Sequence, residues 1–160
     1  MRARELAQDL PTTSLDDEAF VAARLIATQR LPGIAVVDGA GQPVAVLPAS
    51  RVLGFVVPGY IQDDPSLARV LDEVSADALC AQALTGKRVA DLLPATRHRV
   101  ELAAVDGDAT VVECAALMAR LRSPLVVVVD AGRVRGLLTA SHLLEVLLGE
   151  PDSGQPPSAK

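Results

Sequence analysis

The sequence contains the same unit twice, and this duplication limits the possible folds more than any other feature. Residues 14–38 align without a gap with residues 106–130, and nine of the 25 pairs are identical. After a one-residue deletion in the second copy, residues 41–53 align with residues 132–144 with five further identities. A duplicated unit normally packs against its copy to bury a face that neither copy buries alone. We therefore expect two packed halves, with symmetric clefts between them in which a ligand could bind.

Composition and charge exclude several classes of protein. Half of the 160 residues are apolar, which is ample for one core. The chain has only two Phe and one Tyr and a formal net charge of −5, so nucleic acid is not the expected partner. No apolar run approaches the ~20 residues that cross a bilayer, and the start MRARELAQDL lacks the apolar part of a secretory signal. We expect a cytoplasmic protein with no membrane span.

The two cysteines are expected to be buried, reduced thiols. Cys80 and Cys114 do not form a C-x-x-C pair, and two cysteines alone cannot complete a zinc site. Cys80 falls in a helical linker and Cys114 on a core-facing helical stretch, which favours a structural role for both in a reducing cytoplasm.

Each copy shows the same succession of hydrophobic periods. In the first copy, helical spacing runs from Ala19 to about Gln29. Short apolar segments at 33–38 and 43–47 flank a glycine turn and predict a β-hairpin, and a second helix begins at Ser50.

The second copy repeats this order. We expect a helix over about 109–121, strands over 125–130 and 133–138, and a closing helix over 139–148. A short strand is expected before each first helix, near residues 12–13 and within 101–105. The candidate N-caps of the two first helices are Ser14 or Asp16 and Asp108.

These patterns divide the chain into four parts. They are a first repeat (1–55), a linker (56–86), a second repeat (87–148) and a polar, disordered tail (149–160). Within the linker, residues 64–84 predict an amphipathic helix with Asp and Glu on its polar face. This helix either connects the repeats while covering part of the core, or offers its acidic face to a partner.

Two such units in tandem, each with a P-h-h-V-V-D segment, a glycine turn and a strand running into a helix, resemble the CBS-domain pair, or Bateman module. The resemblance covers about residues 3–53 and 87–148. It implies an α/β fold, in which tandem pseudo-symmetric βαββα repeats pack as one intramolecular pair with an inter-repeat helix. It also implies a regulatory homodimer whose clefts bind AMP, ADP, ATP or S-adenosylmethionine.

The resemblance also implies a ligand signature, G-h-x-T/S-x-x-D/N, where the last strand of a repeat meets the final helix. The glycine lets a ligand approach the backbone, and the hydroxyl and the helix N-terminus offer donors to phosphate. In the second repeat, GLLTASH supplies Gly136 and Thr139, with His142 at the acidic position. We therefore expect the ligand in the cleft of the second repeat. The first repeat has other residues at these positions: Ala45, Pro48 and Arg51.

Each candidate ligand residue also has a purely structural interpretation. Thr139 either caps the final helix or contacts the ligand, and His142 is either an ordinary helix residue or an imidazole bound to ribose. Arg51 is either a solvated side chain or a phosphate partner. Ser123 and Pro124 match a family position at which backbone groups hold the base, although Pro124 can also simply end a helix.

Two groups of basic residues remain open in the same way. Arg30 and Arg122 either flank an anionic ligand or provide favourable charge at helix C-termini. A basic cluster at the start of the second repeat is either a solvated face or a funnel for phosphate: Lys87, Arg88, Arg97, His98 and Arg99.

Recognisable catalytic motifs are missing from the sequence. It has no G-x-x-x-x-G-K-[ST], G-x-S-x-G or H-E-x-x-H segment, and only two histidines. We expect a non-catalytic regulatory or sensor module that signals to an unknown effector protein. The alternative is a ligand-free scaffold for dimerisation or protein interaction that uses the 64–84 helix.

Overall fold

The computed structural model of the chain describes residues 1–96 and 100–149. Its helices are α1 Ala3–Leu6, α2 Ala19–Thr28, α3 Ala49–Val56, α4 Gly59–Asp63, the 3₁₀ helix η1 Pro65–Val70, α5 Glu73–Leu84, α6 Val89–Leu92, α7 Val111–Leu121 and α8 Ala140–Leu148. Its strands are β1 Thr12–Ser14, β2 Gly33–Val37, β3 Pro43–Pro48, β4 Ala104–Asp106, β5 Leu125–Asp130 and β6 Arg133–Thr139. The predicted disordered tail beyond Gly149 and the basic residues at 97–99 lie outside the described residues.

The strands form two three-stranded mixed sheets of the same topology. In the order β1-β2-β3, β1 pairs parallel with β2, and β2 pairs antiparallel with β3; β4-β5-β6 repeats this arrangement. The registers also match, because Thr12 pairs with Ala35 as Ala104 pairs with Val127. The predicted α/β fold with tandem repeats is confirmed.

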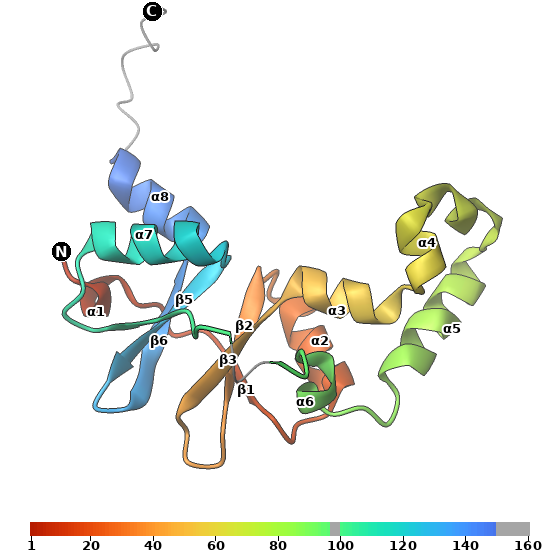
Figure 1. Cartoon of the computed structure of the whole chain (residues 1–160), viewed down its shortest axis with the longest axis horizontal. Coiled ribbons are helices and arrows are strands. Elements are labelled where there is room, and N and C mark those ends of the chain that lie inside the picture. Colours follow the sequence, from red (N-terminus) through yellow and green to blue (C-terminus); the bar gives the residue numbers. More distant parts are fainter. Residues whose placement is uncertain (97–99, 150–160) are drawn as a thin grey trace, which may run out of the picture.

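The two sheets pack against each other in the centre of the molecule, with helices on their outer faces (Figure 1). Side chains alternate along each central strand, as the period of a strand requires. In β2, Ile34 and Val36 join a cluster with α2 and α3, whereas Ala35 faces the other sheet. The residues buried between the sheets are Ala35, Leu125, Val127 and Leu137.

The short opening helix of each repeat packs on the other repeat. In Figure 1, α1 lies beside the second sheet and α6 beside α2. Ala3 N donates to Ala109 O at 2.9 Å, and Leu6 is buried in the core of the second repeat. Correspondingly, Val89 N donates to Asp17 O at 2.9 Å, and Leu92 is buried in the core of the first repeat. The halves are therefore interlocked rather than separate lobes.

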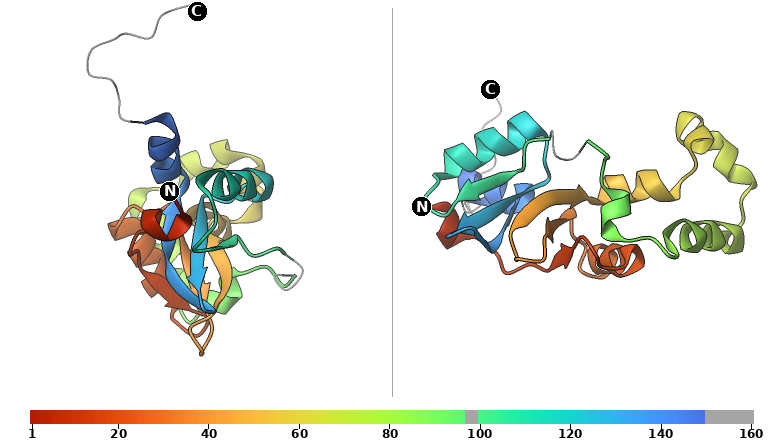
Figure 2. Two further views of the ribbon diagram at one scale, coloured as in Figure 1. Left: turned by 90° about the vertical axis from the view of Figure 1, so that its left-hand side faces the viewer. Right: turned by 60° about the horizontal axis from the view of Figure 1, so that its bottom comes forward.

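The inter-repeat segment differs from the predicted single amphipathic helix. It forms an arm, residues 59–84, that consists of α4, η1 and α5 and projects away from the sheets (Figure 2). The chain is divided because aspartates cap two new helices: Asp64 accepts from Ser66 N at 3.2 Å and Asp72 from Ser75 N at 2.7 Å. No residue between Gln62 and Ala83, a stretch described in full, is buried. Only the end of the predicted 64–84 helix covers the core: Leu84 is buried among the core residues of the first repeat, and Ala83 packs against them.

Some local predictions also need correction. Both cysteines are free, but only Cys114 is buried, where burial raises the pKa of its thiol; Cys80 is exposed on the arm. The cap of α7 is Thr110 rather than Asp108, because Thr110 accepts from Glu113 N at 3.2 Å in a capping box. In the first repeat, α2 likewise begins after Glu18 rather than at Ser14 or Asp16.

Candidate functional site

The two junctions between the last strand of a repeat and the following helix have the same local geometry. β3 runs directly into α3, and Ala49 N donates to Pro32 O at 3.0 Å. β6 runs into α8, and Ala140 N donates to Pro124 O at 3.1 Å. Pro32 and Pro124 therefore lie in equivalent surroundings, and the carbonyl of each already accepts a bond from the helix start.

The cleft of the second repeat is narrowed by the N-terminal segment. Gln8 N donates to Leu137 O at 2.8 Å, and Leu137 N donates back to Gln8 O at 2.9 Å. A Cβ on Gly136 would lie 2.8 Å from Gln8 O and 2.9 Å from the Cβ of Ala7. Gly136 is thus required for the close approach of the chain itself, which is a role of glycine that needs no ligand.

Thr139 performs the capping role that its position allows. Its Oγ1 accepts from His142 N at 3.2 Å and lies 3.2 Å from Ser141 Oγ, and the residue is only 8% exposed. The imidazole of His142 lies beside Glu145, with Nδ1 at 3.6 Å from Oε2. The capping interpretation of Thr139 is confirmed, while ligand contacts of Thr139 and His142 stay predictions.

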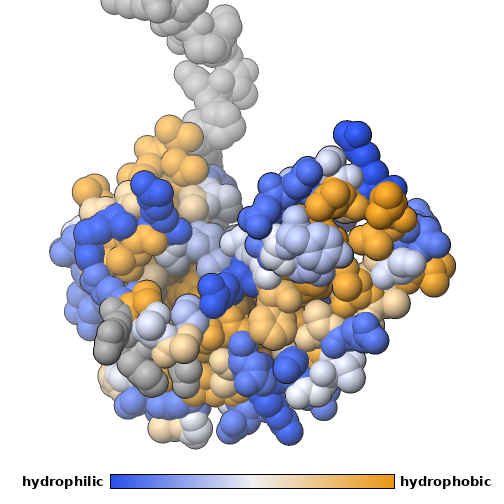
Figure 3. Space-filling view, turned by 45° about the vertical axis from the view of Figure 1, so that its right-hand side comes forward, coloured by the Kyte–Doolittle hydropathy of each residue, from blue (hydrophilic) through white to orange (hydrophobic). Residues whose placement is uncertain are grey.

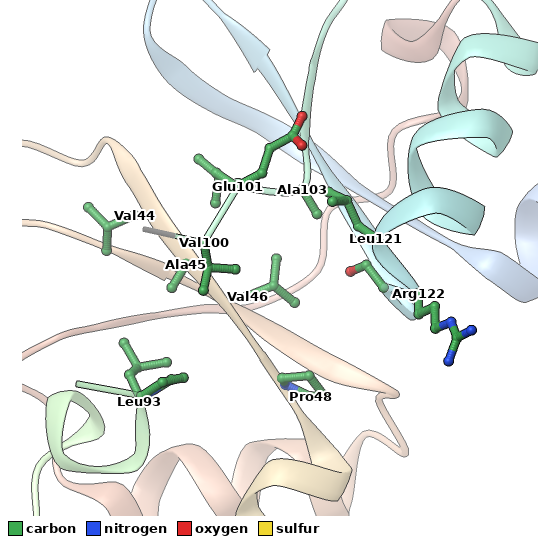
Figure 4. A pocket seen from close by; sticks show the side chains of 13 residues that line it. Val44, Ala45, Val46, Pro48, Leu93, Val100, Glu101, Ala103, Leu121 and Arg122 are labelled. Atoms are coloured by element: carbon green, nitrogen blue, oxygen red, sulfur yellow. The ribbon is translucent and has the colours of Figure 1, made fainter. Parts of the chain in front are cut away.

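The cleft of the first repeat is open. A cavity of about 200 Å³ lies between β3 and the connection that leads from α6 to β4 (Figure 4). It continues into a second cavity of about 630 Å³, which reaches the start of α3 and α4. The two cavities share four lining residues: Val46, Pro48, Leu93 and Pro94.

The difference between the clefts follows from two positions. Pro94 is the second residue after α6, as Gln8 is the second after α1, and proline has no N–H with which to pair with β3. Ala45 stands where the second repeat has Gly136, so its Cβ occupies the space that a pairing segment would need. The connection after α6 is accordingly longer, with residues 93–103 in place of 7–11.

The open cleft combines apolar walls with polar groups at its margins. Figure 4 shows Ala45, Val46 and Leu93 around the cavity, whereas the guanidinium of Arg122 points away from it. Ser123 also lines this cavity, and its Oγ donates to Leu125 O at 2.5 Å.

Arg51, in the first turn of α3, lines the adjoining cavity. Its Nε donates to Leu92 O at 3.1 Å, which fixes the side chain and uses only one of the five guanidinium N–H donors. Gln62 lines the same cavity from α4, and its Nε2 donates to Gly54 O at 2.9 Å and to Val57 O at 2.7 Å. A ligand that places a flat apolar group between the walls of the cleft can therefore place an anionic group beside Arg51.

A bidentate ion pair holds the outer wall of the cleft. Arg120 Nη1 and Nη2 donate to the two carboxylate oxygens of Glu101 at 2.5 and 2.7 Å. The hydrogen bond from Arg120 holds the pKa of Glu101 below its usual range. This pair fastens the connection before β4 to helix α7.

The predicted site residues are therefore divided between two clefts. Arg51 and Ser123 line the contiguous cavities of the first repeat. The other four belong to the junction of the second repeat: Pro124, Gly136, Thr139 and His142. Sequence reasoning missed the importance of Pro94 as the residue that leaves a cleft open. The sequence could have indicated the open cleft through the unequal lengths of the connections from α1 to β1 and from α6 to β4. This difference becomes visible only when α1 and α6 are aligned with each other.

Comparison with known proteins identifies the family. A family model for the CBS domain matches residues 89–149. The solved structure of a CBS domain-containing protein from Kribbella flavida is 49% identical, with a TM-score of 0.78, and the match covers 93% of this chain and 99% of that one. The chain is therefore a CBS-domain protein, and its two repeats form a CBS-domain pair. No curated protein matches it.

More distant structures share the fold. CBSX2 from Arabidopsis thaliana in complex with AMP is 18% identical, with a TM-score of 0.63 and coverage of 92% of this chain and 96% of that one. The CBS domain of a bacterial CNNM/CorC family Mg²⁺ transporter in complex with ATP is 17% identical, with a TM-score of 0.65 and coverage of 94% and 89%. In the described part of this chain, no helix has the length and apolar character to cross a bilayer.

Proposed function

We propose that this CBS-domain pair is a non-catalytic regulatory module that binds an adenosine-containing ligand between its repeats and signals to a partner protein. The proposal is supported by the fold, because two CBS structures of the same fold are complexes with AMP and ATP. AMP, ADP, ATP and S-adenosylmethionine are the candidate ligands.

We assign the ligand to the cleft of the first repeat. The observation that carries this assignment is the open cavity beside Val46 and Pro94, at the place where Gln8 pairs with Leu137 in the other repeat. The apolar walls would enclose the base, and the Arg51 guanidinium would pair with phosphate. The second cleft, with Gly136, Thr139 and His142, is the competing location.

Thermal-shift measurements with each candidate ligand test this function. A ligand at 100 times its dissociation constant stabilises the fold by about 2.7 kcal/mol, which is a shift of several degrees for a protein of this size. Arg51→Ala should remove most of the ligand-dependent shift, and Thr139→Ala should retain it, each measured against the same variant without ligand. Loss of the shift in Thr139→Ala alone would move the ligand to the second cleft.

A ligand-free scaffold for dimerisation or protein interaction is the second candidate function. The exposed apolar side chains of the arm favour it, since such surfaces usually mark interaction sites. If none of the four ligands shifts the unfolding temperature at millimolar concentration, the scaffold is the better explanation. Sedimentation of the free protein then tests whether it is the expected homodimer.

A further inference from the structure

The arm is an ordered segment with almost no core of its own. It contains three short helices in residues 59–84, and none of its side chains from Gln62 to Ala83 is buried. Isolated helices below about 12–15 residues are marginal in water, so an arm of this kind gains stability when another surface covers its apolar side chains.

The apolar side chains of the arm are exposed to an unusual degree. Val70 is 88% exposed and Val74 77%, and Tyr60, Leu67 and Leu71 are exposed as well. Leu67 and Val70 are three residues apart in the 3₁₀ helix η1, where side chains at that spacing eclipse each other. Figure 3 shows hydrophobic surface gathered on the arm among hydrophilic side chains.

Charge determines which partner fits this surface. The arm carries one basic residue, Arg69, and five exposed acidic residues: Asp63, Asp64, Asp72, Glu73 and Asp77. Its net charge of −4 is most of the −5 of the whole chain, so a second arm, equally acidic, would be repelled. A partner with apolar side chains and a basic rim satisfies both features of the surface.

The base of the arm also borders the open cleft. Gln62 of α4 and Phe55 of α3 line the cavity that Arg51 lines, and Gln62 holds α4 against the end of α3 through Gly54 O and Val57 O. A group bound beside Arg51 would therefore touch the element from which the arm projects.

We propose that the arm is the docking surface for the effector, and that it binds a basic amphipathic helix of that protein. This inference rests on the regulatory function proposed above, because such a module needs an output surface. The apolar side chains around Val70 and Val74 provide the contact, and the carboxylates of Glu73 and Asp77 select a partner with lysine or arginine at its rim.

The test uses two labelled peptides and the full chain without nucleotide. Both peptides have leucines at positions i, i+3, i+4 and i+7, and one has lysine and the other glutamate at the polar positions. In fluorescence anisotropy the lysine peptide should bind at least about tenfold more tightly than the glutamate peptide. Equal binding of the two peptides would overturn the proposal.

Variants locate the binding surface. The double substitution Val70→Ser and Val74→Ser should weaken binding of the lysine peptide about tenfold or more, since it removes the central apolar contacts. The matched control is Val112→Ser on α7, a valine that is 69% exposed and should leave binding unchanged. All three positions are exposed, so unfolding temperatures should stay close to wild type.

Two results would contradict the assignment. Wild-type affinity in the Val70→Ser, Val74→Ser variant would show that the peptide binds elsewhere. A dimer that this variant dissociates, together with no binding of the lysine peptide, would show that a second copy of the chain covers the arm. Because nucleotide is absent, failure here is separate from failure of the cleft assignment, which the thermal shifts report.

Discussion

Two arginines at equivalent positions adopt a backbone conformation that favours glycine. Arg30, two residues after α2, has a φ of 52°, and Arg122, directly after α7, has a φ of 50°. A left-handed residue at this position ends a helix, and a side chain there costs roughly 1 kcal/mol. Both arginines were expected either to flank a ligand or to mark helix ends, and the backbone supports the second role.

Arg122→Gly should therefore stabilise the protein by about 0.5–1 kcal/mol, measured by urea unfolding. The matched control is Arg24→Gly in the interior of α2, which should destabilise by about 1 kcal/mol, since glycine is unfavourable within a helix. A loss of stability in Arg122→Gly would mean that its side chain makes a contribution larger than the backbone cost.

Gly136 gives a second prediction at this scale. Gly136→Ala should destabilise by about 1–3 kcal/mol, because the new methyl group would lie 2.8 Å from Gln8 O. Gly54→Ala within α3 is the control, because a Cβ there meets no atom within 4 Å, and a small gain is expected. Equal effects in urea unfolding would contradict the tight contact between β6 and the N-terminal segment.

At the scale of elements, exposed carboxylates anchor helix starts and the wall of the cleft. Hydrogen bonds to Arg120, Thr110 and Ser75, respectively, lower the pKa of Glu101, Glu113 and Asp72. A lowered pKa in the folded state means that the unfolded state binds protons more readily, so stability rises with pH through this range. Their contributions are complete above the unfolded pKa and disappear as pH falls through the folded pKa.

We therefore expect the free energy of unfolding to decrease from about pH 5 towards pH 3. Glu101→Gln should make this decrease shallower, because one of the groups with a lowered pKa is removed. Urea unfolding at a series of pH values measures the slope. An unchanged slope in Glu101→Gln would show that the ion pair with Arg120 does not persist in solution.

The elements also show what can be predicted from a sequence. The apolar periodicity, together with Pro32 and Pro124, which end the helices before each hairpin, was enough to predict the hairpins and helices of both repeats. Residues 64–84 were predicted as one helix because their apolar spacing is continuous. In the structure, the side chains of Asp64 and Asp72 each cap the start of a new helix, which divides the segment. A hydrophobic period does not distinguish a face that packs on the core from one left exposed.

The candidate site was less predictable for a related reason. The signature residues Gly136 and Thr139 match the family pattern, but both have structural roles, in a backbone approach and a helix cap. The open cleft depends on Pro94, which has no group typical of ligand binding. Its effect is that it has no N–H to form a backbone hydrogen bond with β3. Contacts between segments far apart in the chain decide which cleft is open, and no local motif records them.

At the scale of the whole molecule, the exchanged opening helices join the two repeats into one cooperative unit. Leu92 of α6 is fully buried in the core of the first repeat, although it begins the second. Arg4 of α1 pairs in turn with Asp108 at 3.1 Å and with Asp130 at 3.2 Å in the second repeat. Neither repeat retains a complete core without the other.

Leu92→Ala should consequently destabilise the entire chain by about 2–5 kcal/mol. Both repeats should still unfold in one transition. Urea titration, monitored by hydrogen exchange of the amides in β2 and β5, measures this. Leu53→Ala, at a leucine that is 64% exposed on α3, is the control and should have little effect. Separate transitions for β2 and β5 would contradict the interlocked arrangement.

We propose that the ligand binds in one cleft only, that of the first repeat. Calorimetric titration with the candidate ligand that gives the largest thermal shift tests this most directly. Wild type is compared with Val46→Phe, because Val46 lines both cavities and a larger side chain there would occupy the space for the ligand. We predict one ligand per chain in wild type and no binding in a folded Val46→Phe variant. Two ligands per chain, or unchanged binding in Val46→Phe, would contradict binding in the first cleft alone.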